Sequence, residues 1–342
     1  MTDEFHPSSA PPSTSIYHEG TMKPSFKSRF PCIRREDDFV SATSTRVCQY
    51  FAENWPWKSS TERDRFADQG IDMWPAFSFH DMPDDRLECV CLCSALAFLF
   101  DDMFESRSPD EMKQVFVRFE GLLMGTVLPA SGDKFERVIF EISTLLRGNR
   151  KTDPFGLGEK YCEETLRWAK GSVRNQLSSK PHYSDLTEYL KDRFTDGGLW
   201  WTLSMLNWAY DTPIPQHLED DPNIRELQII FGSYSLLVND IYSYRKELIE
   251  ARMQGDNIEN NLVSATPVAM RVWNCSADEA INHIESHIRW IEEHSFPEIE
   301  AKLKAGYTGN DLKFLEKYVE RIKLIAGGNA VWSEWCGRYN RF

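Results

Sequence analysis

Apolar residues recur at helical spacing along nearly the whole chain from about residue 38. Strand-like alternation with hairpin dipeptides is missing, and turn residues gather in stretches such as 211–223. Many helices with mixed loops predict a single all-α domain built as a helical bundle. Besides 39–55, the periodic segments lie around 86–106, 111–124, 134–147, 156–178, 184–210, 222–254, 277–303 and 309–326.

One segment is apolar on more than one face. Residues 89–100, CVCLCSALAFLF, contain one hydroxyl group and no charge. Such a helix is expected in the interior of a bundle, with neighbours all round. Directly after it come Asp101, Asp102 and Glu105. Charge at the end of an interior helix is costly unless something positive joins it.

The acidic cluster has a spacing that suits a metal site. Asp101 and Glu105 lie four residues apart and share a helix face with Phe98. An aromatic ring below carboxylates predicts an apolar pocket with a hard cation, such as Mg²⁺, at its rim. The alternative is a solvated acidic patch, which the helix dipole mildly disfavours at a C-terminus.

A similar pattern, DDRLE at 84–88, precedes the apolar run. Acidic residues at a helix start cap it and complement its dipole. We therefore assign Asp84, Asp85 and Glu88 a structural role.

A second polar cluster follows another apolar stretch, residues 236–238. Asn239, Ser243 and Glu247 are spaced i, i+4, i+8 and form one column on a helix, with Lys246 close to it. All three column residues carry oxygen ligands, although an exposed polar stripe would have the same spacing. Facing each other across the mouth of a bundle, the two clusters would hold several Mg²⁺ ions, and these would hold a diphosphate.

Composition narrows the class of protein. The chain has 342 residues, enough for one large domain or two ordinary ones, and 13% are aromatic. Its net charge of −14, with no basic run, argues against nucleic acid as a partner. No apolar run reaches the roughly 18 residues of a membrane span. The eight cysteines form no C-x-x-C pair and are expected to be free thiols in a reduced, cytoplasmic protein.

The beginning of the chain differs from the rest. Residues 1–30 are rich in Pro, Ser and Thr, as in HPSSAPPSTS. We expect a flexible or loosely attached tail there, followed by one domain over residues 31–342.

These motifs resemble those of the class I terpene synthases, especially the fungal sesquiterpene cyclases. The family's aspartate-rich DDxx(D/E) matches 101–105, and its ND(L/I/V)xSxxKE matches NDIYSYRKE at 239–247. The family also has a diphosphate-sensing Arg about 46 residues before that Asn, where Arg193 stands here. Asp196 and Gly197 occupy the places of its linker Asp and helix-break Gly.

The C-terminus extends the resemblance to roughly residues 40–340. WSEWCGRY provides Trp332, Ser333, Arg338 and Tyr339, like the family's Arg-Tyr pair preceded by Trp-Ser. The stretch GDNIENNLV at 255–263 also looks like the family's sequence after the second motif.

The resemblance implies a fold, a ligand set and a substrate. The fold would be the class I terpenoid synthase bundle around a central active-site cavity. Three Mg²⁺ ions, for which Mn²⁺ can substitute, would clamp the diphosphate of a linear prenyl diphosphate. Asp101 would bridge metals on one side, with weaker roles for Asp102 and Glu105. On the other side, the ligands would be Asn239, Ser243 and Glu247.

The remaining matches would act on the leaving group and the carbocation. Hydrogen bonds to diphosphate oxygens would come from Arg193, Lys246, Arg338 and Tyr339. Asp196 and Gly197 would form a helix break that turns carbonyls toward the pocket; the alternative is a tight helix crossing. Phe98 and Trp332 would present aromatic faces to the cation. Weaker candidates, for which core packing is the favoured reading, are Phe77, Phe79, Trp200 and Trp201.

We therefore expect a sesquiterpene synthase, a carbon–oxygen lyase acting on farnesyl diphosphate and releasing a cyclic hydrocarbon or alcohol. Geranyl or geranylgeranyl diphosphate is the alternative substrate. A chain-elongating synthase would usually carry two DDxxD motifs, whereas the second motif here has the Asn/Ser/Glu form. A class II cyclase would carry a DxDD motif, and this chain has none. A catalytically inactive helical scaffold is the non-enzyme alternative. The resemblance is compatible with a homodimer, and the sequence alone identifies no dimer interface.

Overall fold

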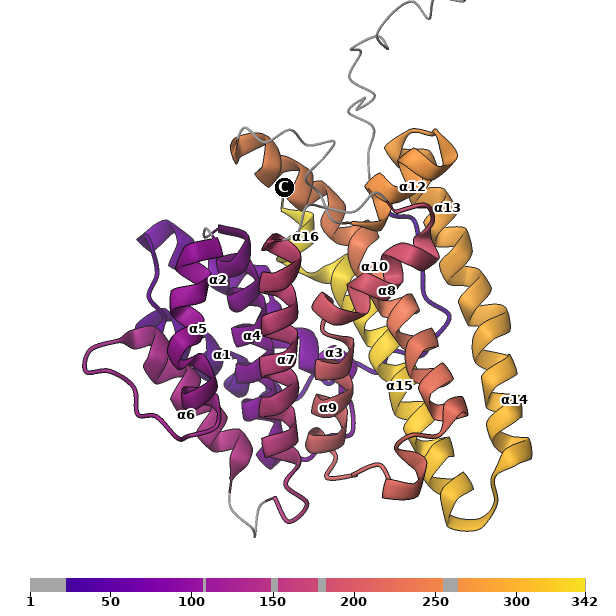
Figure 1. Ribbon diagram of the computed structural model, residues 1–342, viewed down its shortest axis with the longest axis horizontal. Helices are drawn as coiled ribbons and strands as arrows, with labels where there is room; N and C mark the ends of the chain where they lie inside the picture. Colours follow the sequence, from indigo (N-terminus) through magenta and orange to yellow (C-terminus); the bar gives the residue numbers. More distant parts are fainter. Residues whose placement is uncertain (1–22, 107–108, 149–152, 178–182, 255–263, 342) are drawn as a thin grey trace, which may run out of the picture.

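The computed structural model describes residues 23–106, 109–148, 153–177, 183–254 and 264–341. These residues form helices and loops with no β-strand, which confirms the all-α prediction. The helices lie side by side in one bundle (Figure 1). They are α1 (Asp38–Asn54), α2 (Ser60–Gln69), α3 (Trp74–Ser78), α4 (Asp84–Ser106), α5 (Pro109–Leu123), α6 (Lys134–Arg147), α7 (Leu157–Leu177), α8 (Leu186–Asp196), α9 (Leu199–Ala209), α10 (Pro222–Gln254), α12 (Ala265–Trp273), α13 (Ala277–Trp290), α14 (Phe296–Gly306), α15 (Gly309–Trp335) and α16 (Gly337–Asn340).

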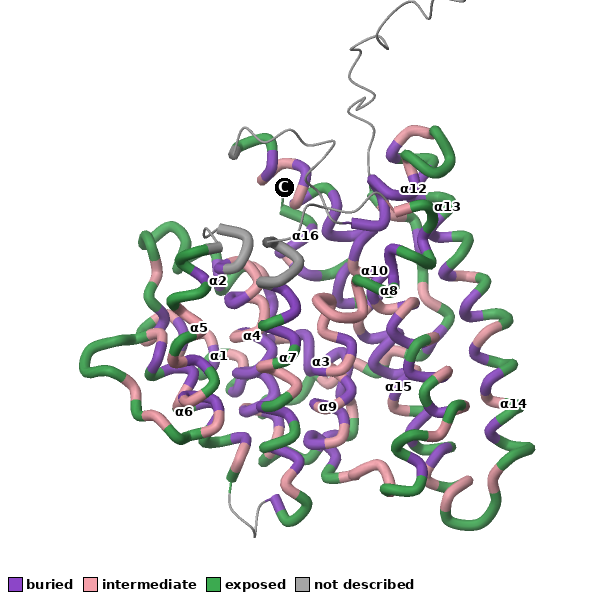
Figure 2. The backbone as a smooth tube through the Cα atoms, in the orientation of Figure 1, coloured by how far each residue is buried: buried purple, intermediate pink, exposed green. Residues whose placement is uncertain are grey.

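Helices α4, α10 and α15 carry much of the core. Buried positions recur along the length of each (Figure 2). Helix α10 packs along α15, while α4 contacts α1, α3, α6 and α9. The prediction that residues 89–100 form an interior helix is therefore correct. The ends of these helices position the candidate site.

The acidic residues to which we assigned a structural role lie at the start of α4, and two of them form ion pairs. Asp84 forms an ion pair with Arg35, and Glu88 forms one with Arg46 at 2.6 Å. Asp85 is exposed. These contacts tie the start of α4 to α1 and to the segment before it.

The segment just before α1 is anchored to the far end of the chain. Phe26 is 1% exposed, and the Glu285 carboxylate accepts hydrogen bonds from the Ser25 and Phe26 backbone nitrogens at 2.6 and 2.9 Å. One turn of π-helix, Ile291–Ser295, follows α13, and its Glu292 accepts from the Arg29 nitrogen at 2.9 Å. These residues thus pack into the domain, although they fall within the stretch expected to be loosely attached. Residues 1–22 lie outside the described part of the chain.

Two further expectations concern the whole chain. All eight cysteines are free thiols, as predicted. Among the described residues, no helix is both long enough and apolar enough to cross a membrane.

Candidate diphosphate and metal site

The end of α4 meets α10 and α16 through one carboxylate. Asp102 accepts two hydrogen bonds from Arg338, with Nη2–Oδ1 at 2.6 Å and Nη1–Oδ2 at 3.0 Å. Lys246 of α10 lies 3.7 Å from the same carboxylate. Gln69, the last residue of α2, accepts from Arg338 Nη1 at 2.8 Å. The first acidic motif, the second motif and the C-terminal Arg-Tyr pair are thereby brought together.

The second motif is joined to the C-terminus by a separate contact. Asn239 donates from Nδ2 to the Tyr339 hydroxyl at 2.8 Å. Since α10 is continuous from Pro222 to Gln254, Asn239, Ser243 and Glu247 stand in one column, as their spacing predicts.

Arg193 reaches the same region from the last turn of α8. Its guanidinium contacts the Asp196 carboxylate at 3.1 Å and the Asp240 carboxylate at 3.5 Å. The Nε atoms of Arg193 and Arg338 are both buried and have no hydrogen-bond partner among the described residues. Two buried cationic donors therefore remain available for an anion.

The carboxylates differ in their electrostatics. Partial burial raises the pKa of Asp101, although Arg338, Arg193 and Lys246 all lower it. Partial burial would also raise the pKa of Asp102, but the ion pair with Arg338 outweighs it and holds that pKa below its usual value. Three cations from α16, α8 and α10 thus surround the end of α4.

Glu247 lacks comparable compensation. Burial, together with the nearby charge of Asp240, raises its pKa to about 7. A divalent cation beside it would reduce the cost of desolvating this partly buried carboxylate. The oxygen donors of Asn239, Ser243 and Glu247 are of the kind that Mg²⁺ prefers.

The described side chains do not form a closed metal cage. Within them, no three His, Cys, Asp or Glu residues lie close enough to hold a metal ion. The Glu105 side chain and the stretch 255–263 lie outside the described residues. A site completed by substrate oxygens is the usual arrangement for Mg²⁺, which needs only one or two carboxylates from the protein.

Phe98 and Trp332 form an aromatic layer next to the cations. Their ring centroids are 5.4 Å apart, and Arg338 lies over the Phe98 ring at 5.0 Å. Trp332 is fully buried and donates from its indole nitrogen to the Gly70 carbonyl at 2.8 Å. Trp332 also meets Tyr339 edge-on at 5.6 Å.

The weaker aromatic candidates are engaged in packing. Phe77 packs against Trp335 with tilted rings, and Phe79 meets Trp74 edge-on. Arg225 lies 4.7 Å over Trp200.

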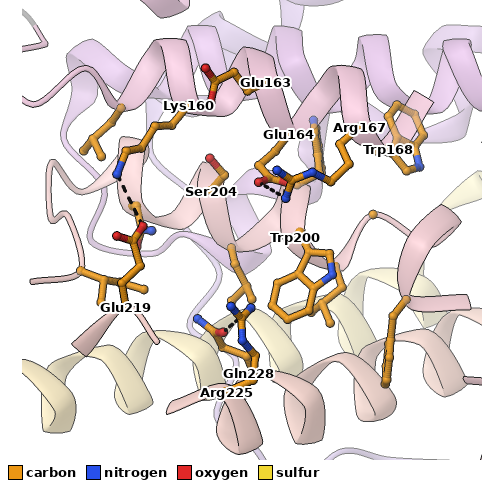
Figure 3. Close-up of a pocket in the computed structure, with 18 of the residues that line it drawn as sticks. Lys160, Glu163, Glu164, Arg167, Trp168, Trp200, Ser204, Glu219, Arg225 and Gln228 are labelled. Carbon is orange, nitrogen blue, oxygen red and sulfur yellow. Dashed lines mark hydrogen bonds and ion pairs between the residues drawn. The ribbon is translucent and has the colours of Figure 1, made fainter. Parts of the chain in front are cut away.

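Trp200 and the remaining weak candidate, Trp201, line a groove of about 660 Å³ between α7, α9 and the start of α10 (Figure 3). Some of the charged side chains that line the groove form ion pairs with one another: Lys160 pairs with Glu219, and Arg167 pairs with Glu164. The predicted metal and diphosphate residues are not among those that line it.

The break between α8 and α9 is real, and it is also a tight crossing. Gly198 has φ of +73°, a conformation that favours glycine, and it separates the two helices. A Cβ atom at Gly197 would collide with Leu236 of α10 and lie 2.7 Å from the Arg193 carbonyl oxygen. The structure therefore shows the helix break and the tight crossing together, and a role of the break in turning carbonyls toward the pocket stays a prediction. The Trp168 indole donates to the Asp196 carbonyl at 2.7 Å and fixes the break from the α7 side.

Sequence reasoning missed four residues that hold the site together. Gln69 and Trp168 carry no periodic signal that points to a site. Asp240 and Tyr189 form a 2.5 Å hydrogen bond in the core. The signal available for Asp240 was its place as the second residue of the motif at 239–247, directly after the apolar residues 236–238.

Comparison with known proteins places these features in a family. The family model "Terpene synthase family 2, C-terminal metal binding" matches residues 93–293. Aristolochene synthase of Aspergillus terreus is 23% identical over 303 residues, covering 88% of this chain and 90% of that protein. Terpene synthase 6 of Dictyostelium purpureum is 26% identical over 268 residues, covering 77% and 78%.

A solved structure agrees with this fold. The crystal structure of aristolochene synthase from Penicillium roqueforti superposes with a TM-score of 0.73 at 21% identity. The match covers 91% of this chain and 99% of that one.

We predict that Gly197→Ala destabilises the fold by about 1–3 kcal/mol, because the new methyl group has no room against Leu236. Thermal unfolding followed by circular dichroism measures the effect. Gly306→Ala is the matched control, since a Cβ atom there meets nothing within 4 Å. Equal unfolding midpoints for the two variants would show that α8 and α10 do not cross as closely as described.

Proposed function

The chain belongs to terpene synthase family 2, and from this premise we propose that it is a sesquiterpene synthase of class I. Its substrate would be farnesyl diphosphate, which loses diphosphate and leaves an allylic carbocation that cyclises. The product would be a cyclic C15 hydrocarbon or alcohol. The choice of a C15 substrate rests on the aristolochene synthases among the similar proteins.

One observation carries the proposal. Arg193, Lys246 and Arg338 come from three different elements and converge on the carboxylates at the end of an apolar helix. Arg193 and Arg338 each keep a buried Nε–H that has no hydrogen-bond partner among the described residues. Buried guanidinium groups with unused hydrogen-bond donors are suited to binding a leaving group with several negative charges. The oxygen ligands on α10 are suited to binding the metal ion that would accompany it.

The chain's own residues would divide the work. Arg193, Arg338 and Lys246 would donate hydrogen bonds to the diphosphate oxygens, where negative charge grows as the carbon–oxygen bond breaks. Tyr339 would donate from its hydroxyl group, which burial keeps protonated by raising its pKa. Phe98 and Trp332 would offer aromatic faces to the carbocation and exclude water from it.

The metal residues would act on the same leaving group. Asp101, Asp102 and Glu105 would hold Mg²⁺ from α4, and Asn239, Ser243 and Glu247 from α10, with three ions expected. When bound, the ions neutralise the diphosphate and so favour its departure. For Asp102 this requires release from Arg338, whose guanidinium would then be free to bind the diphosphate.

The direct test is incubation of the purified protein with geranyl, farnesyl and geranylgeranyl diphosphate, each with Mg²⁺ and with a chelator. We expect diphosphate release and a cyclic C15 product from farnesyl diphosphate only in the presence of Mg²⁺. Gas chromatography with mass detection identifies the product. A cyclic product from another chain length would correct the substrate. Absence of diphosphate release from all three would favour the inactive scaffold.

The site assignment is tested by substitution. We predict that Asp101→Ala and Asn239→Ala each lower turnover by about 100-fold or more while the fold is kept, because each removes an oxygen ligand aimed at the leaving group. Steady-state diphosphate release measures turnover, and circular dichroism checks the fold. Asp84→Ala is the control, since its exposed ion pair with Arg35 lies at the other end of α4. If Asp84→Ala is as damaging as Asp101→Ala, the acidic motif has been misassigned.

A further inference from the structure

Asp240 follows the first residue of the oxygen column but belongs to a different contact. Consecutive residues on a helix point about 100° apart, so Asp240 does not share the face of Asn239. Its side chain is 1% exposed and lies against α8 and the start of α12. A buried carboxylate at this position needs a reason, because the proposed metal chemistry does not use it.

The two oxygens of Asp240 are engaged differently. Oδ2 accepts from the Tyr189 hydroxyl at 2.5 Å and from the Ala265 backbone nitrogen at 3.1 Å. Oδ1 faces the Nη2 atom of Arg193 at 3.5 Å. Two hydrogen bonds to Oδ2 therefore hold the carboxylate against α8 and α12 and leave the other oxygen directed at the guanidinium.

Arg193 is held by two carboxylates from different helices. Asp196 contacts Nη1, and Asp240 contacts Nη2. One contact alone would leave the planar guanidinium free to turn about it, whereas contacts to both Nη atoms fix its plane. The orientation of the buried, unpartnered Nε–H then follows from that plane.

Tyr189 and Arg193 lie four residues apart on α8, so they share one face and bracket Asp240 between them. Tyr189 is fully buried, and its ring meets Tyr183 edge-on at 5.3 Å. Removal of its hydroxyl group would leave this packing in place and remove only the bond to Asp240.

We propose that Tyr189 and Asp240 are positioning residues that orient Arg193 toward the diphosphate. This inference rests on the proposed function, in which Arg193 binds the leaving group. It makes the second residue of the NDIYSYRKE motif the physical link between the oxygen column on α10 and the arginine on α8.

The test is a double-mutant cycle of wild type, Tyr189→Phe, Arg193→Lys and the double variant. Three quantities are measured for each protein: the affinity for inorganic diphosphate with Mg²⁺, by calorimetry, and kcat and KM for farnesyl diphosphate. Because the lost hydrogen bond involves a charged group, Tyr189→Phe should lower both kcat and diphosphate affinity about tenfold. KM should stay within about twofold, since the contact matters most where the leaving group carries its full charge.

The cycle separates positioning from simple loss of stability. In the Arg193→Lys background, Tyr189→Phe should add less than about a twofold change, because lysine has no plane to orient. Tyr183→Phe is the matched control. It removes a neighbouring hydroxyl bonded to Asp192 at 3.2 Å and should leave all three quantities within about twofold of wild type.

The outcomes are distinguishable. Independent, multiplicative effects of the two substitutions, or a Tyr189→Phe variant equal to wild type, would overturn the positioning role while leaving the proposed function intact. If wild type with Mg²⁺ binds no inorganic diphosphate, the proposed function itself fails, and the inference fails with it.

Discussion

Carboxylates at the end of a helix packed on all sides must be compensated by nearby positive charge. Helix α4 places Asp101 and Asp102 at that position after twelve residues without a charge. Burial of such groups without partners would cost several kcal/mol each. The arrangement of α8, α10 and α16 at this end of the bundle follows from that requirement, because each supplies one cation: Arg193, Lys246 and Arg338.

The charges at this end of the bundle are only partly compensated by one another. Asp102 is paired with Arg338, whereas the partly buried Glu247 has its pKa raised to about 7, and the Nε atoms of Arg193 and Arg338 lack hydrogen-bond partners among the described residues. Among the described residues, a cation would therefore stabilise the charged form of Glu247. An anion would accept hydrogen bonds from the Nε–H groups of Arg193 and Arg338. A metal ion bound to a diphosphate satisfies both at once. The proposed function rests on this combination of a carboxylate that a metal ion would stabilise and donors that a diphosphate would accept from.

The sequence predicts the long helices well because their apolar stripes are strong. The interior position of α4 and the column on α10 both follow from spacing alone. Helix α2 gives no such signal, since Phe66 is its single buried residue, yet it supplies Gln69 to Arg338. The anchoring of Phe26 could not be predicted either, because its partner Glu285 lies 259 residues away in the chain. The link between Tyr189 and Asp240 depends in the same way on how α8 crosses α10, which no periodicity reveals.

The account rests on one claim about geometry: that the ligands on α4 and α10 and the three cations serve a single diphosphate. A crystal structure with Mg²⁺ and inorganic diphosphate tests it most directly. The account predicts metal ions on Asp101 and on the Asn239–Ser243–Glu247 column, with Arg193 and Arg338 donating to one diphosphate between them. A diphosphate bound elsewhere, or an Arg338 still paired with Asp102 beside a bound diphosphate that it does not touch, would contradict it.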